Sequence, residues 1–108
     1  MAQTRKGLKT VFKSEEQYAP RNIKEEFLIE TFLKAKSKKE ISSLLRDLMT
    51  LPEIEEFANR LHIAQLLLKG KSYMQIADET GVSTTTVTRV AHWLFSGCGG
   101  YQQVLRKK

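Results

Sequence analysis

Apolar residues recur every three or four positions through most of this chain, and no stretch alternates between apolar and polar residues as a strand would. A repeat of that length gathers the apolar side chains on one face of a helix. The pattern predicts helices over residues 22–36, 37–50, 52–69, 73–80, 83–95 and 101–108. We therefore expect an all-α fold of about six helices.

Residues with capping chemistry mark where these helices begin and end. Three helices open with the capping-box pattern, in which a small polar residue precedes a Glu or Gln by three positions. The pairs are Asn22 with Glu25, Ser37 with Glu40, and Ser72 with Gln75. Pro52 suits the first turn of the third helix, where its missing N–H is not needed. Gly81 tolerates a left-handed backbone and therefore allows a tight turn after the fourth helix.

Two of the helices are apolar over more than one face. The first carries Ile23, Phe27, Leu28, Ile29, Phe32 and Leu33, and the third carries Ile63, Leu66 and Leu67 beside its main stripe. A helix that is apolar around so much of its girth must be covered on two sides, and a small domain has little with which to cover it. The pattern favours a symmetric homodimer. The alternative is a compact monomer in which both helices are central.

Residues 73–94 have the arrangement of a helix-turn-helix, in which the second helix enters the major groove of DNA. Apolar or small residues fall where the two helices would face each other: Ile76, Ala77, Val82, Val87, Val90 and Leu94. The outward positions of the second helix hold threonines, which are poor helix formers, in place of the usual Glu and Lys. That choice favours groups that reach phosphates and base edges. The alternative is a plain pair of core helices.

The outward residues divide into two expected roles on DNA. Lys71, Ser72 and Gln75, at the start of the first of these helices, are expected to hold the phosphate backbone. The second helix supplies the remaining predicted DNA contacts, which are Ser83, Thr84, Thr85, Thr86, Thr88, Arg89 and His92. Arg89 can fork onto a guanine, and the threonine methyl groups can meet thymine methyl groups.

The charge of the chain supports an anionic partner. The 108 residues carry a net charge of +6, and no Asp or Glu follows Glu79. Nucleic acid and an anionic membrane surface both fit that charge, but every apolar run is too short to span a bilayer and the N-terminus lacks a signal-peptide pattern. We expect a cytoplasmic protein that binds double-stranded DNA and no membrane. Residues 1–21 form a basic arm before a domain over 22–108, and the arm either adds phosphate contacts or is a solvated tail.

Chemistry beyond binding has little support in the sequence. One cysteine, Cys98, with His62 and His92 far apart along the chain, cannot complete a zinc site. The acids near residue 53 complement a helix dipole without a catalytic partner. The glycines at 97–100 lack the strand and the Gly-Lys-Ser/Thr ending of a nucleotide-binding loop. We expect no enzymatic activity, no metal and no cofactor.

Several short motifs together resemble the Trp repressor family, and most closely its YerC/YecD group of Trp repressor-related proteins. They are the residues at 44–49 (LLRDLM), 51–52 (LP), 59–61 (NRL), 67–70 (LLKG) and 86–89 (TVTR). The resemblance covers residues 22–105, and it implies six helices in an intertwined homodimer that binds DNA.

The resemblance also implies an effector pocket. The two ligand-contacting arginines of the family match Arg60 and Arg89, and Thr86 matches a neighbouring pocket position. Val90 stands where the family pattern has a glycine that leaves room for the indole ring, and Leu51 replaces a threonine. A β-branched side chain in the space of the ring is poorly tolerated by a packed pocket. We therefore expect tryptophan not to be the effector, and the pocket either stays empty or takes another ligand.

These features together predict a sequence-specific, DNA-binding transcriptional regulator that acts as a homodimer. Two other functions stay open. One is a nucleic-acid binder driven by charge alone, whose affinity would fall with salt but would not prefer one site. The other is a protein-interaction module on the same fold, with the basic arm on an acidic partner.

Overall fold

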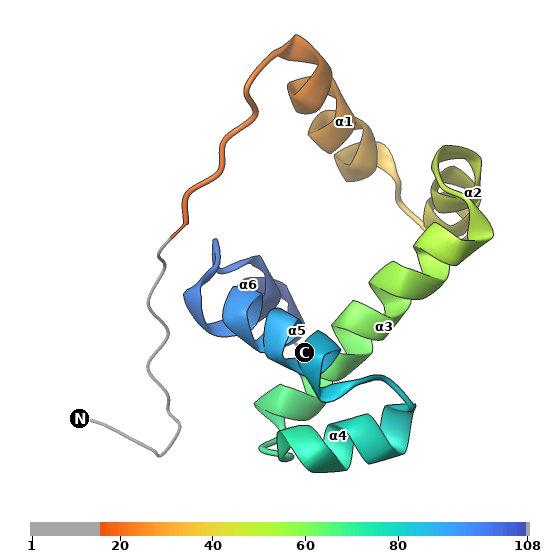
Figure 1. Cartoon of the computed structure of the whole chain (residues 1–108). Helices are drawn as coiled ribbons and strands as arrows, with labels where there is room; N and C mark the ends of the chain where they lie inside the picture. Colours follow the sequence, from red (N-terminus) through yellow and green to blue (C-terminus); the bar gives the residue numbers. More distant parts are fainter. Residues whose placement is uncertain (1–15, 108) are drawn as a thin grey trace. The chain divides into compact units, whose positions relative to one another are not determined.

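A computed structural model describes residues 16–107 of the chain (Figure 1). It contains six α-helices: α1 (Ile23–Lys34), α2 (Lys38–Leu48), α3 (Leu51–Leu68), α4 (Tyr73–Thr80), α5 (Thr84–Ser96) and α6 (Gly100–Leu105). No strand occurs between residues 16 and 107. The prediction of an all-α fold with about six helices is confirmed. Most of the predicted basic arm lies outside the described residues.

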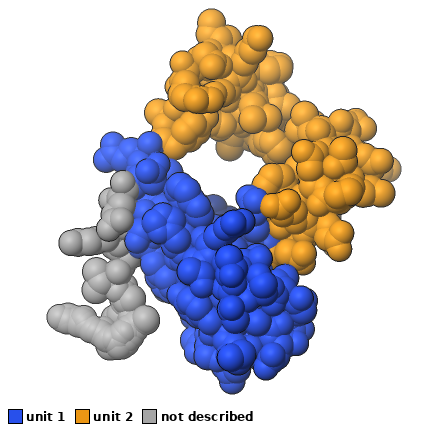
Figure 2. Space-filling model, in the orientation of Figure 1, with its two compact units in different colours: residues 1–17, 60–108 blue, residues 18–59 orange. Residues whose placement is uncertain are grey.

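The chain divides into two compact units, coloured separately in Figure 2. Residues 18–59 form one, with α1, α2 and the first half of α3. The other contains residues 60–107 of the described part, with the second half of α3 and helices α4, α5 and α6. Helix α3 is therefore shared by both units as one continuous helix.

The hydrophobic core lies in the unit that contains residues 60–107, which is blue in Figure 2, and joins α3, α4 and α5. Nine apolar side chains are buried there: Ile63, Ala64, Leu66, Leu67, Ile76, Val87, Val90, Ala91 and Leu94. Full burial of one aliphatic side chain stabilises a fold by about 1.5–3 kcal/mol. Of the residues predicted to lie between the helices, Ala77 and Val82 are only partly buried. Helix α6 packs on this core through Tyr101 and Leu105, while Val104 is 64% exposed.

The unit of residues 18–59, which is orange in Figure 2, has no buried side chain on α1, on α2 or on its part of α3. Large apolar side chains are exposed along it instead, among them Ile23, Phe27, Leu28, Leu33, Leu48, Leu51 and Phe57. The excess of apolar surface that the sequence indicates is therefore present in the chain taken alone.

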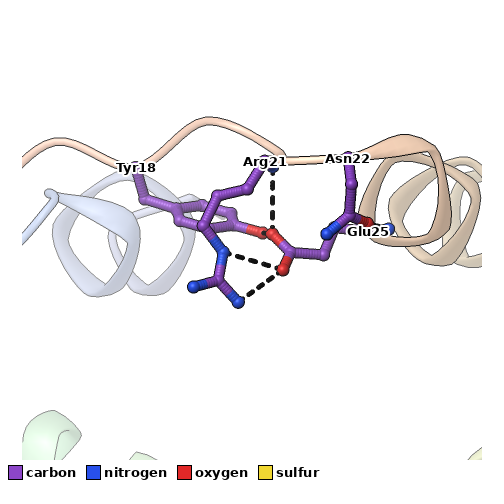
Figure 3. Close-up of polar contacts among 4 residues, drawn as sticks. All are labelled: Tyr18, Arg21, Asn22 and Glu25. Atoms are coloured by element: carbon purple, nitrogen blue, oxygen red, sulfur yellow. Dashed lines mark hydrogen bonds and ion pairs between the residues drawn. The ribbon is translucent and has the colours of Figure 1, made fainter.

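A cluster of polar contacts fixes the chain before α1 (Figure 3). Asn22 caps the helix and accepts a hydrogen bond from the backbone N–H of Glu25. The Glu25 carboxylate accepts bonds from Arg21 Nε and Nη2 at 2.8 and 2.6 Å, from Tyr18 Oη at 2.6 Å and from the Arg21 backbone. The Arg21 guanidinium, followed by the Tyr18 hydroxyl, lowers the pKa of Glu25 from 4.5 to about 2. The hydrogen bond that Tyr18 Oη donates to Glu25 raises the pKa of the Tyr18 hydroxyl.

Helix α3 begins at Leu51, one residue before the predicted start at Pro52. Thr50 Oγ1 accepts a bond from the Glu53 backbone N–H, and the Glu53 carboxylate accepts one from the Thr50 backbone N–H. This reciprocal pair has the form of a capping box, with Thr50 in the capping position. The bond to Thr50 Oγ1 satisfies the N–H of Glu53, one of the N–H groups in the first turn that have no partner within the helix.

Candidate nucleic-acid interface

The α4–α5 pair is held by caps at each junction. Ser72 Oγ accepts the Gln75 N–H at 3.1 Å, and Gln75 Oε1 accepts the Ser72 N–H at 2.8 Å, which confirms the predicted capping box. Gly81 follows with φ of 81°, a left-handed conformation that a Cβ would strain. Ser83 then caps α5 by accepting the Thr86 N–H. Only three residues separate the two helices.

Helix α5 has two distinct faces. Val87, Val90, Ala91 and Leu94 are buried against α3 and α4 in the core. Thr84, Thr85, Thr88, Arg89 and His92 are exposed. The helix contains no Asp or Glu, so nothing on its own surface repels a phosphate.

The hydroxyl groups of α5 differ in what they already bond. Ser83 and Thr86 share a contact of 3.1 Å between their side-chain oxygens, and Thr86 is half-buried. Thr88 Oγ1 donates to the Thr84 carbonyl at 2.9 Å. Within residues 16–107, the side chains of Thr84 and Thr85 make no hydrogen bond. Thr84 and Thr85 therefore have the hydroxyls most available to a ligand, and Thr88 offers mainly its methyl group.

Arg89 and His92 lie one turn further along the exposed face. Arg89 is exposed and forms no ion pair or hydrogen bond with any described residue. The His92 and Trp93 rings pack in a T-shaped arrangement, with ring centroids 5.2 Å apart and planes at 82°. A guanidinium without an internal partner keeps all its donors for an external acceptor.

The residues predicted to hold phosphates at the start of α4 are already engaged within the protein. Ser72 and Gln75 bond each other in the capping box, which leaves the Gln75 amide N–H donors free. Lys71 Nζ lies 2.9 Å from Glu79 Oε1 and 3.2 Å from Glu79 Oε2. The sequence pattern does not predict this ion pair.

The three predicted effector-pocket residues come from two helices, with Arg60 in α3 and Thr86 and Arg89 in α5. Val90, which follows Arg89, is 4% exposed and belongs to the core. The Val90 side chain therefore fills space that a glycine at the same position would leave open.

Arg60 also lies close enough to Tyr101 to act on its pKa. Burial raises the pKa of Tyr101, and the positive charge of Arg60 partly opposes that rise.

Residues 16–107 lack two other features. No group of three His, Cys, Asp or Glu side chains is placed to hold a metal ion. No helix in that range is long and apolar enough to cross a membrane.

The fold and this surface define a helix-turn-helix protein, with a capped helix, a left-handed glycine and a second helix that has one buried and one exposed face. The family model described as "Trp repressor protein" matches residues 24–108. The chain belongs to the Trp repressor family, whose members are DNA-binding regulators. The resemblance carried by the short motifs is therefore confirmed.

Individual relatives agree with this assignment. The chain is 37% identical over 78 residues to YerC of Bacillus subtilis (strain 168), covering 72% of this chain and 75% of that protein. The crystal structure of a TrpR-like protein from Eubacterium eligens superposes with a TM-score of 0.75 at 32% identity, covering 79% of this chain and 88% of the other. A putative Trp repressor from Staphylococcus aureus gives a TM-score of 0.74 at 30% identity, covering 79% and 85%.

Proposed function

We propose that this protein is a sequence-specific transcriptional regulator that binds double-stranded DNA through residues 73–94. The observation that carries the proposal is the exposed face of α5. Thr84, Thr85 and Arg89 point out of a helix whose opposite face is buried, and none of the three side chains is used inside the described part of the protein. Unused donors on a rigid helix are what reading of base edges requires.

The roles on DNA follow from this arrangement. Helix α5 enters the major groove, Arg89 forks onto a guanine, and the methyl groups of Thr84, Thr85 and Thr88 meet thymine methyl groups. His92 extends the same face toward the groove wall, while Ser83 and Thr86 support the start of the helix. The free backbone N–H groups at the start of α4, with Lys71, Ser72 and Gln75, hold phosphates.

The regulator acts as a homodimer in this proposal. The exposed apolar side chains of α1 and of the first half of α3 support it, because a monomer rarely leaves so much apolar surface in water. A two-fold dimer places two recognition helices about 34 Å apart, one turn of B-DNA, so its operator is palindromic. The basic arm, residues 1–21, adds phosphate contacts ahead of the domain over 22–108.

A small-molecule effector is a separate part of the proposal. Arg60, Thr86 and Arg89 occupy the family's pocket positions, but Val90 is packed in the core where the family pattern has glycine. We expect no binding of tryptophan at this place.

Selection of binding sites from random duplex DNA, with the purified protein at near-physiological salt, tests the function directly. Enrichment of one two-fold symmetric site is the expected result. Recovery of no motif, with binding that disappears as salt rises, would instead identify a charge-driven nucleic-acid binder. No binding to any duplex at low salt would identify an interaction module that uses the fold as a scaffold.

A further inference from the structure

The backbone of Lys71 is fixed between two helix ends. Gly70, at φ of 88°, donates its N–H to the Leu67 carbonyl, and Lys71 donates its N–H to the Leu66 carbonyl. These two bonds form a Schellman motif, which closes α3. Ser72 immediately opens the capping box of α4. Lys71 therefore stands at one defined place, just before the first turn of α4, and only its side chain is free to move.

The side chain of Lys71 reaches along α4 to Glu79, in the last turn of that helix. Glu79 lies near the C-terminus of α4, where the macrodipole disfavours an anion, and the Lys71 ammonium lies 2.9 Å from its carboxylate. The Lys71 ammonium is therefore the main compensation for the negative charge of Glu79. The two side chains are 40% and 43% exposed, so water and salt screen the pair and it exchanges partners readily.

A DNA phosphate at the start of α4 would compete with Glu79 for the same ammonium group. We propose that Glu79 acts as an internal competitor for phosphate, so that DNA binding exchanges the Glu79 carboxylate for a phosphate at Lys71 and Glu79 lowers the affinity for every duplex. This inference rests on the proposed function. The loss caused by the pair is at most about five-fold, because an exposed ion pair changes an equilibrium by no more than that.

The neighbouring acid supplies a matched control. Asp78 is exposed on the same helix and makes no ion pair or side-chain hydrogen bond with any residue from 16 to 107. Glu79→Gln and Asp78→Asn change the net charge equally, but only Glu79→Gln frees Lys71. The affinities of both variants and of the unaltered protein are measured on the selected site and on random duplex, across a range of salt concentrations. Circular dichroism checks that each variant folds.

Glu79→Gln is expected to bind both duplexes about two- to five-fold more tightly than Asp78→Asn does. The higher affinity of Glu79→Gln relative to Asp78→Asn should vanish when Lys71→Gln is also present, because no ammonium is then left to release. Lys71→Gln should lower the salt slope by about 0.9, the value for one lost phosphate contact, which a merely structural role would not change.

Three results would overturn the exchange. Equal effects of Glu79→Gln and Asp78→Asn would mean that both acids repel DNA only through their charge. If Glu79→Gln still binds more tightly than Asp78→Asn in the absence of the Lys71 ammonium, the difference in affinity comes from the position of Glu79 and not from the ion pair. A salt slope unchanged by Lys71→Gln would show that Lys71 meets no phosphate. Failure of all variants to bind any duplex would overturn the proposed function as well.

Discussion

Substitution of Val90 tests both the core and the effector proposal. Val90 is 4% exposed and packs in the core next to Arg89. Val90→Gly removes three buried carbon groups, each of which contributes about 0.8 kcal/mol. Glycine in a helix interior adds about 0.4 kcal/mol over valine, so the free energy of unfolding should fall by about 3 kcal/mol. Val90→Ala removes two groups and gains helix propensity, so it should cost only about 1 kcal/mol.

The same substitution opens the space that the family pattern keeps for an indole ring. L-Tryptophan should therefore stabilise Val90→Gly, by about 1.4 kcal/mol at ten times its dissociation constant, and should leave the unaltered protein unchanged. Val90→Ala keeps a Cβ in that space and serves as the control for a simple loss of stability. Urea unfolding at one fixed protein concentration, followed by circular dichroism, measures both effects without interference from the fluorescence of the ligand.

Two outcomes would refute this reasoning. Stabilisation of the unaltered protein by tryptophan would mean that the buried valine does not block the ring. A loss of less than 1 kcal/mol for Val90→Gly would mean that the core collapses around the missing side chain, so that no open space is created.

Three further predictions can be checked with standard assays. Arg89→Ala should lower affinity for the selected site by about 1–3 kcal/mol and spare random DNA, and Arg89→Lys, which keeps the charge but not the fork, should lose the same preference in binding assays. Because the pKa of Glu25 is depressed to about 2, its contribution to stability is present above pH 4.5 and is lost as pH falls toward 2, so urea unfolding of Glu25→Gln should lack that acid-dependent loss. Gly97→Ala should lower the melting temperature because its Cβ would overlap the Trp93 carbonyl and lie 3.1 Å from Trp93 Cε3, whereas Gly100→Ala, with nothing within 4 Å, should not.

Local chemistry explains why the helix starts could be predicted. Asn22, Ser37 and Ser72 each cap the helix that the sequence assigns to them, because the capping bond joins residues only three positions apart. Helix α3 begins one residue before Pro52, where the sequence predicts its start, because the Thr50–Glu53 pair caps it there. The buried face of α5 could also be predicted, because apolar residues that recur every three or four positions lie on one face of a helix.

The rest depends on contacts that no local pattern encodes. Lys71 and Glu79 are eight positions apart, which is not a spacing at which helical neighbours meet, so their pairing was invisible in the sequence. The proposed homodimer adds contacts between two chains, and a sequence can only indicate the apolar surface that would make them.

The buried and the exposed residues of α5 have separate roles. Its place in the fold is set by the buried positions, and the exposed positions contribute almost nothing to stability because they contact so little. Substitutions at Thr84, Thr85 or Arg89 are therefore free to accumulate without unfolding the protein. A lineage of such proteins can change the DNA it recognises while its core stays the same.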